Sequence, residues 1–210
     1  MSHVQEMDAL KLLGGLETDS VDVAIIAPPN TMNPMPTFRA LSRVLKPRGV
    51  AWYLTEDDYN GPTIAGFPWR RALLIDAMQD WDLLMDCIVL KTTTNHDAHR
   101  RPQPLHDYVF MFAQSPDYRY FVLDSGVNHT SVWKINNSTQ DHPEYPYFQN
   151  PELLIDILIR MTCPKDGVVL DPFMGTGTTA VVAERLGRQW IGGDCDAAAC
   201  EIAERRISNG

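Results

Sequence analysis

The chain has 210 residues, of which 44% are hydrophobic and 21% are charged. This composition is ordinary for a globular protein and excludes the disordered and fibrous classes, and no apolar run approaches the ~20 residues that cross a bilayer. The net charge of −9 argues against a protein that wraps nucleic acid over its whole surface, although it leaves room for a local basic face.

The cysteines and the first residues indicate the compartment. The four cysteines form no C-x-x-C pair, so neither a zinc ribbon nor a disulfide framework is expected. His96 and His99 are three residues apart without further ligands, so no metal site is expected either. The N-terminus lacks the basic start and apolar core of a signal peptide. We therefore expect a cytoplasmic protein with no membrane partner.

Strand and helix patterns alternate along the chain, which predicts an α/β fold with a mainly parallel sheet. Up to residue 123, strands are predicted at 21–26, 49–55, 83–90 and 107–113, with helices at 36–45 and 68–79 and a hairpin partner of the last strand at 118–123. Residues 127–150 are polar, aromatic and rich in proline, which predicts a loop region. Beyond it, helices are predicted at 151–161, 178–186 and 197–207, and strands at 167–171 and 189–193.

The most informative stretch is the loop Asp171-Pro-Phe-Met-Gly-Thr-Gly-Thr-Thr-Ala180. A predicted strand ends in a carboxylate, two glycines permit a tight turn, and a helix begins with its positive end facing the same crevice. Asp194 ends the next predicted strand, where a carboxylate can accept both ribose hydroxyls of a nucleoside. This pattern favours a nucleoside cofactor over a purely structural turn.

The order of the elements narrows the choice of cofactor. A dinucleotide enzyme normally opens with such a unit and builds the rest of its sheet downstream. Only residues 195 to 210 follow Asp194, so the other strands must come from upstream. This order disfavours a nicotinamide oxidoreductase and favours a permuted methyltransferase.

The motifs resemble those of the amino-group DNA methyltransferases of the permuted class, which methylate cytosine N4 or adenine N6. The resemblance rests on Asp171-Pro-Phe-Met-Gly-Thr-Gly-Thr-Thr, Leu186-Gly-Arg-Gln-Trp-Ile-Gly-Gly-Asp194, Phe148-Gln-Asn-Pro-Glu-Leu-Leu154, Ser131-Val-Trp-Lys-Ile135 and Arg101-Pro-Gln-Pro-Leu-His-Asp-Tyr-Val-Phe110. It implies a circularly permuted, Rossmann-like fold that binds S-adenosylmethionine, with helices on both faces of the sheet. A single domain over residues 1–210 is expected, with a catalytic half at about 20–90, a small recognition region at about 91–146 and a cofactor half at about 147–207.

The resemblance also implies a set of cofactor-binding residues. Thr176 and Thr178 would present amides or hydroxyls to the methionine carboxylate, and Asp194 would hold the ribose. An alternative for Asp194, compatible with the first, is an N-cap of the last helix. The expected cofactor-binding set is Asp171, Pro172, Phe173, Gly175, Thr176, Gly177, Thr178, Asp194, Cys195, Asn150 and Pro151.

The catalytic motif departs from the family pattern. The family carries Ser, Asp or Asn, then Pro-Pro, then an aromatic residue, whereas this chain reads Ala27-Pro28-Pro29-Asn30. The side-chain oxygen and the first proline's carbonyl accept hydrogen bonds from the amine N–H groups, and the aromatic ring stacks on the extruded base. Losing one such acceptor costs about 3 kcal/mol, and losing the stacking costs about 1–3 kcal/mol more.

Three explanations remain open for this motif. The chain is a weak or inactive methyltransferase that retains cofactor or DNA binding, or it is an engineered inactive variant. Alternatively, it acts on another amine, with a substitute acceptor from Asn30 or Asn33 and an apolar contact from Met32, Phe67 or Trp69.

Basic residues ahead of the 107–113 strand are the candidates for DNA contact, since phosphates are bound mainly by cationic side chains. The expected DNA-binding set is Lys91, His96, His99, Arg100, Arg101 and His106. For His106 a structural hydrogen bond is the favoured reading. So small a recognition region suggests a short target, loose specificity or help from a second subunit in a homodimer.

The sequence thus predicts a DNA methyltransferase that uses S-adenosylmethionine, with cytosine N4 slightly ahead of adenine N6 as the target. The alternative from another class is a non-catalytic protein that binds the cofactor or DNA. Roles in restriction-modification, viral evasion and regulation are all compatible with the sequence.

Overall fold

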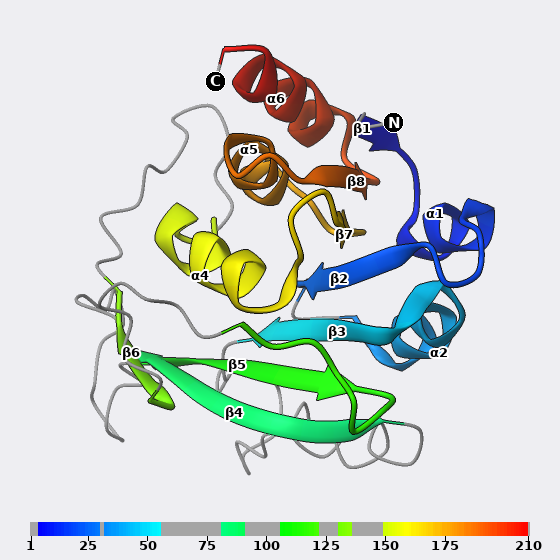
Figure 1. Cartoon of the computed structure of the whole chain (residues 1–210). Helices are drawn as coiled ribbons and strands as arrows, with labels where there is room; N and C mark the ends of the chain where they lie inside the picture. The colour runs from blue at the N-terminus through cyan, green and yellow to red at the C-terminus, as the bar shows by residue number, and fades with distance from the viewer. Residues whose placement is uncertain are drawn as a thin grey trace, which may run out of the picture.

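One sheet of eight strands organises the part of the chain that the computed structural model describes, residues 4–29, 32–55, 81–90, 106–121, 130–135 and 149–209 (Figure 1). The strands are β1 (Val4–Glu6), β2 (Val21–Ile26), β3 (Leu45–Thr55), β4 (Asp82–Leu90), β5 (His106–Ala113), β6 (Val132–Lys134), β7 (Val168–Asp171) and β8 (Gln189–Asp194). The helices are α1 (Ala9–Gly15), α2 (Met35–Val44), α4 (Glu152–Thr162), α5 (Thr178–Arg185) and α6 (Ala197–Ser208). The strand order is β1-β8-β7-β2-β3-β5-β4-β6.

Most neighbouring strands are parallel, as the alternation of strands and helices predicts. Only β5 runs antiparallel to its neighbours, β3 on one side and β4 on the other. Helices cover both faces, with α4 and α5 on one side and α1 and α2 on the other (Figure 1). The predicted α/β, Rossmann-like architecture is therefore confirmed.

The two faces of the sheet bury separate cores. Along β2, Val23 and Ile25 pack toward α4 and α5, while Ala24 and Ile26 pack toward α1 and α2. This explains why the strand is apolar on both sides, as expected for a central parallel strand. Between β3 and α4, the Trp52 indole Nε1 donates a hydrogen bond to the hydroxyl of Thr162, at 3.0 Å.

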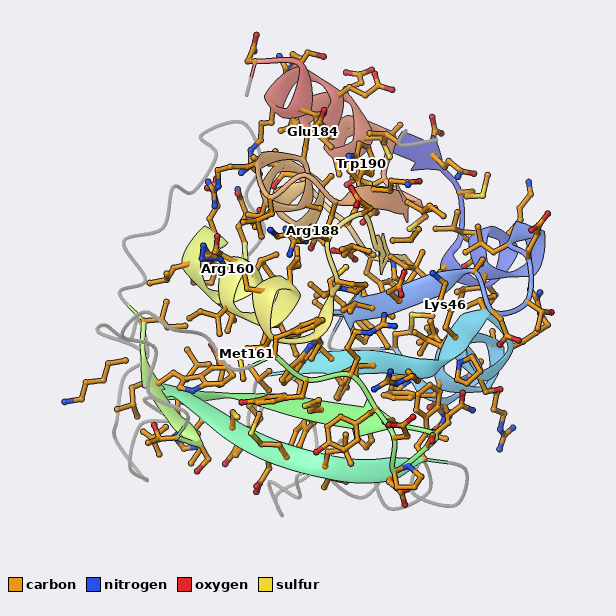
Figure 2. The ribbon with its side chains drawn as sticks, in the orientation of Figure 1. Lys46, Arg160, Met161, Glu184, Arg188 and Trp190 are labelled. Carbon is orange, nitrogen blue, oxygen red and sulfur yellow. The ribbon has the colours of Figure 1, made fainter. Side chains whose placement is uncertain are left out.

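A second polar contact joins α5 to the sheet. The Trp190 indole Nε1 on β8 donates to the Glu184 carboxylate on α5, at 3.2 Å (Figure 2). The contact satisfies the one polar atom of a side chain that is otherwise buried, as tryptophan requires in a core. It therefore fixes α5 against the strand that follows it.

Several predicted elements need correction. The described part of the expected strand at 118–123, residues 118–121, is not a strand, because β5 is already paired on both sides. Tyr120 and Phe121 are 37% and 39% exposed, so they are not the core residues that a strand pattern predicts. The strand β6 lies inside the expected loop region, within the Ser131–Ile135 motif on which the resemblance partly rests. Sequence reasoning missed β1 and α1, and the expected helix at 68–79 lies outside the described residues.

A buried carboxylate ties three strands together at the end of the sheet where β2 begins. Asp22 is 3% exposed, and its oxygens accept from Lys46 Nζ at 2.7 Å, Arg119 Nη1 at 2.7 Å and the Val168 amide at 3.0 Å. Burial alone would raise the pKa of Asp22, but the hydrogen bonds from Lys46 and Val168 hold this pKa below its usual value. The charge is therefore paired rather than stranded in the core.

No helix among the described residues is long and apolar enough to cross a bilayer.

We expect Asp22→Asn to lower the free energy of unfolding by about 2–4 kcal/mol, because it removes the central charge of a buried ion cluster. The matched control is Asp117→Asn, which breaks the exposed ion pair with Arg48 at 3.3 Å and should cost less than about 1 kcal/mol. Urea unfolding followed by tryptophan fluorescence measures both. Equal losses in the two variants would contradict the central role of Asp22.

Candidate functional site

The carboxyl ends of β2 and β7 mark the expected binding site of this sheet. These strands are parallel neighbours, with Val23 opposite Val169 and Ala24 opposite Leu170. From β7 the chain proceeds through α5 to β8, and from β2 it proceeds through α2 to β3, in opposite directions along the sheet. Ligands of open α/β sheets bind at such a switch point, outside the carboxyl ends of the strands.

The loop between β7 and α5 turns back on the sheet at this switch point. Gly175 and Gly177 have φ values of +49° and +82°, a region that side chains other than glycine adopt at a cost. The Met174 amide donates to the Gly193 carbonyl at 3.1 Å, which pins the loop to β8. A Cβ at Gly175 would meet nothing within 4 Å, so the loop has open space on that side.

The helix α5 begins directly from this loop. Its N-cap residue is Gly177, and no side chain caps the first turn. The N-terminal amides of a helix that lacks a side-chain cap favour an anionic group of a ligand. The loop therefore offers backbone donors and open space at the place where the amino-acid end of S-adenosylmethionine is expected.

Asp171, the last residue of β7, binds both ends of the loop that follows it. One oxygen accepts from the Phe173 amide at 3.0 Å, and the other accepts from the Thr179 hydroxyl. Burial raises the pKa of Asp171 to about 7, against the opposing effect of these two hydrogen bonds. This carboxyl thus changes its charge near neutral pH, next to the expected cofactor site.

Asp194 lies at the end of β8, across the loop from Asp171. Its Oδ2 accepts from the Gly175 amide at 2.9 Å and its Oδ1 from the Asp196 amide at 3.0 Å. The N-cap of α6 is Asp196, so the capping role considered for Asp194 belongs to its neighbour. An ionised carboxylate has about four acceptor positions, which leaves room for the ribose hydroxyls. Cys195 is exposed beside it, and no metal-binding cluster occurs among the described residues.

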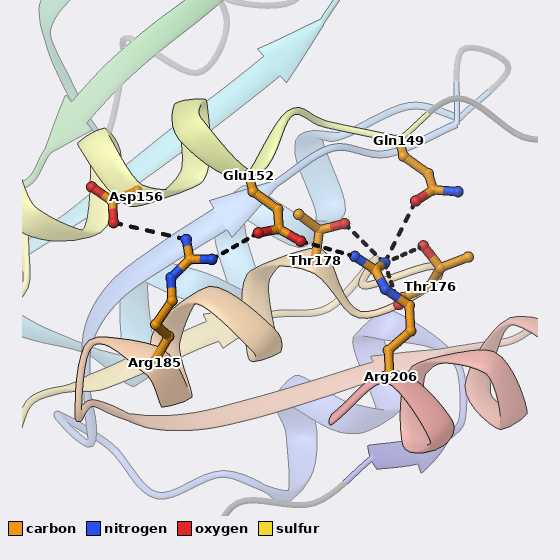
Figure 3. A network of polar contacts seen from close by, with 7 residues as sticks. All are labelled: Gln149, Glu152, Asp156, Thr176, Thr178, Arg185 and Arg206. Atoms are coloured by element: carbon orange, nitrogen blue, oxygen red, sulfur yellow. Dashed lines mark hydrogen bonds and ion pairs between the residues drawn. The ribbon is translucent and has the colours of Figure 1, made fainter. Parts of the chain in front are cut away.

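A polar network joins this loop to the segment before α4 (Figure 3). Arg206 of α6 donates from Nη1 to the Thr176 carbonyl at 2.8 Å, the Thr176 hydroxyl at 2.9 Å and the Thr178 hydroxyl at 3.2 Å. The same nitrogen lies 3.5 Å from Gln149 Oε1, and Nη2 lies 3.4 Å from Glu152. Burial lowers the pKa of Arg206, and Glu152 opposes that shift.

Sequence reasoning missed three members of this network: Arg206, Gln149 and Glu152. Gln149 and Glu152 flank the expected Asn150 and Pro151, so the motif around them was a signal for both. For Arg206 the sequence carries no local signal, because its partners lie 28 to 57 residues away along the chain.

The end of β2 carries the altered motif. Ala27 and Pro28 are half-buried, and Ala27 packs against the core on the α4 side. The Pro29 carbonyl accepts from the Met32 amide at 2.9 Å. Asn33 Oδ1 accepts from the Met35 amide at 3.0 Å, so one of the two acceptor positions of this oxygen is used at the start of α2.

The remaining expected site residues divide between the described part of the chain and the rest. His106 Nε2 lies 2.7 Å from the Tyr108 hydroxyl, with the two rings edge to face. This contact agrees with the structural hydrogen bond favoured for His106. The residues outside the described part are Asn30, Phe67, Trp69, Lys91, His96, His99, Arg100 and Arg101.

Comparison with known families gives one match over most of the chain. The family model N6_N4_Mtase, described as DNA methylase, matches residues 34–205. Among curated proteins, the type II methyltransferase M.SmaI of Serratia marcescens is 26% identical over 211 residues, 81% of this chain and 71% of that protein. In two further type II methyltransferases, the region that matches this chain covers only 50% and 45% of the length of those proteins.

Solved structures give the same fold. The PvuII DNA methyltransferase, described as cytosine-N4-specific, superposes with a TM-score of 0.85 at 18% identity, covering 97% of this chain and 85% of that one. The complex of M1.HpyAVI with S-adenosylmethionine superposes with a TM-score of 0.78 at 16% identity, covering 99% of each chain. At these identities the similarity establishes the fold.

We expect Gly177→Ala to destabilise the protein more than Gly175→Ala. Both positions have positive φ, which costs a side chain about 1–2 kcal/mol. A Cβ at Gly177 would also lie 2.8 Å from the Ala203 Cβ of α6, whereas Gly175 faces open space. Urea unfolding measures the difference, and the double variant with Ala203→Gly should lose less stability than the sum of its two single variants. Strict additivity would contradict the clash.

We expect Asp171→Asn to remove a pH dependence of stability. The pKa of Asp171 is about 7 in the folded protein, against 3.8 in the unfolded chain. Between these two pH values the carboxyl is protonated in the folded protein and ionised in the unfolded chain. The stability of the wild type relative to Asp171→Asn should therefore fall as pH rises from about 4 to 7, by an amount on the order of 4 kcal/mol. Urea unfolding of both proteins between pH 4.5 and 7.5 tests this, and a constant difference would contradict the raised pKa.

Proposed function

We propose, from the premise that the chain belongs to the DNA methylase family whose model matches residues 34–205, that it transfers a methyl group from S-adenosylmethionine to an exocyclic amine of a DNA base. The family uses S-adenosylmethionine as its methyl donor and acts on cytosine N4 or adenine N6. We take cytosine N4 as the first candidate. Because the chain covers only about half of some curated relatives, its own activity and target are part of this proposal.

The observation that carries the proposal is the pairing of β2 with β7. The register that sets Ala24 opposite Leu170 places the end of β2 beside the end of β7. The Ala27-Pro28-Pro29 turn and the loop after Asp171 therefore leave the sheet at the same edge. A methyl donor held by the loop and an amine held at the turn would meet there, as direct transfer requires.

In this proposal the residues around the loop hold the cofactor. Asp194 accepts from the ribose hydroxyls, while Asp171, Pro172, Phe173 and Cys195 line the adenosine side. At the other end, the backbone of Gly175 to Thr178, with Asn150 and Pro151, surrounds the amino-acid moiety. The cofactor supplies a methyl group on a positively charged sulfur, which is a strong electrophile.

The Pro28 carbonyl is the surviving acceptor for the amine. A carbonyl fixed by the proline ring accepts a hydrogen bond from one amine N–H and helps direct the nitrogen lone pair toward the methyl group. Ala27 offers no second acceptor, and loss of one preorganised partner costs about 3 kcal/mol, or about a hundredfold or more in rate. We therefore expect slow methyl transfer without a covalent enzyme intermediate.

DNA contact is assigned to the edge that carries His106 and to the basic residues before it. His106 begins β5, which runs antiparallel to β3, so it lies at the same edge of the sheet as the end of β3. In the proposal Lys91, His96, His99, Arg100 and Arg101 bind phosphates nearby. A homodimer would extend this small recognition surface.

A second candidate function is binding without catalysis. It is favoured by Ala27, which removes the side-chain acceptor, and by the engagement of the Asn33 oxygen at α2. A protein of this kind would keep the cofactor site and the fold while lacking transfer.

The deciding experiment is methyl transfer from labelled S-adenosylmethionine to unmethylated DNA, with the product nucleosides identified by mass. N4-methylcytosine or N6-methyladenine in the digest would support the proposal and name the base. A protein that binds S-adenosylhomocysteine but leaves DNA unlabelled would support the binding function instead.

We expect the double variant Ala27→Ser, Asn30→Tyr to raise the transfer rate by about a hundredfold or more, since it restores an acceptor and a stacking ring. The single variant Ala27→Val, which adds bulk without an acceptor, is the control. If the double variant binds the cofactor and stays inactive, the methylated substrate is not the one proposed.

A further inference from the structure

Arg206 lies at the centre of the polar network in Figure 3, although no expected motif contains it. Its Nη1 faces four oxygens: the Thr176 carbonyl, the hydroxyls of Thr176 and Thr178, and Gln149 Oε1, at 2.8 to 3.5 Å. One guanidinium thus contacts both the loop at the switch point and the segment that leads into α4. These are the two stretches that the proposed function assigns to the amino-acid end of the cofactor.

The helix that carries Arg206 is packed closely against this loop. Ala203, one helical turn earlier, approaches Gly177 so closely that a Cβ there would lie 2.8 Å from the Ala203 Cβ. The side chain of Arg206 is only 17% exposed. The guanidinium is therefore held by surrounding protein rather than moving freely in water.

The ion pairs of Glu152 brace the other side of the guanidinium. Nη2 of Arg206 lies 3.4 Å from Glu152 Oε1, while Glu152 Oε2 accepts from Arg185 Nη1 at 2.8 Å. Arg185 also lies 3.9 Å from Asp156 (Figure 3). These contacts link α4, α5 and α6 around the loop, so the position of Arg206 is set by three helices.

The side-chain amide of Gln149 gives an independent indication of a ligand. Arginine has only donors, so the oxygen of Gln149 must be the atom that faces Arg206. Nε2 consequently points away from Arg206, and within the described part of the chain this buried donor has no hydrogen-bond partner. Gln149 is 9% exposed, and a buried amide without an acceptor is costly. An acceptor on a bound ligand would satisfy it.

We propose that Arg206 is a positioning residue of the cofactor site, which holds the loop at Thr176 and Thr178 and orients Gln149 so that its Nε2 donates to the carboxylate of S-adenosylmethionine. This inference rests on the proposed cofactor binding and deepens it. Arg206 itself touches no part of the cofactor, because Nη1 is occupied by the loop and Nη2 faces Glu152.

Two ligands separate this role from a general effect on folding. S-Adenosylhomocysteine carries the amino-acid end, whereas 5′-methylthioadenosine has the adenosine and the sulfur without it. Isothermal titration calorimetry should show that Arg206→Ala weakens binding of the first by about tenfold or more, the range for a hydrogen bond to a charged group, and of the second by less than about twofold. Gln149→Ala should show the same selectivity, and Arg206→Lys should recover part of the loss.

The matched control is Arg48→Ala, which removes an exposed arginine that contacts Asp117 and should change neither affinity. If Arg206→Ala does not fold, Arg206→Lys and Gln149→Ala carry the comparison. Equal weakening of both ligands, or unchanged binding of S-adenosylhomocysteine, would overturn the inference. A wild-type protein that binds neither ligand would overturn the cofactor proposal as well, and this outcome is distinguishable because it does not involve the variants.

Discussion

The parallel pairing of β2 with β7 is the constraint on which the rest of this structure depends. Val23 lies opposite Val169 and Ala24 opposite Leu170, so two distant parts of the chain share one ladder of hydrogen bonds. Because parallel strands end at the same edge, the turn at Pro28 and the loop at Gly175 become neighbours without being close in sequence. That these two loops are neighbours therefore depends on the strand pairing and not on the order of the two halves along the chain.

The two ends of β2 have different roles. At its start, Asp22 is fully paired and joins β3, β7 and the segment around Arg119. At its end, Ala27 and Pro28 reach the crevice. There the Ala27 side chain packs against the core on the α4 side, so the fold is retained with a residue that lacks the usual acceptor.

The sequence was a good guide to whatever depends on local pattern. The strands at 21–26 and 83–90, the glycine loop and the helices after it follow from periodicity, glycine spacing and strand-end carboxylates, and the structure confirms them. The failure at 118–121 has a different origin, because an aromatic, alternating segment resembles a strand whether or not the sheet has an edge to accept it. Here β3 and β4 already occupy both sides of β5. Arg206 was not predicted for a related reason, since its contacts exist only once α6 has packed against the loop.

In the described part of the chain, both edges of the sheet are formed by strands of three residues, β1 and β6. A strand this short offers a neighbouring molecule few free backbone groups, and a chain that extends the sheet would gain little. These short edges limit how far the sheet of one molecule can pair edge to edge with the sheet of another. Two copies that pair through helices or loops instead rely on side chains, rather than on backbone hydrogen bonds, to select the surfaces that fit.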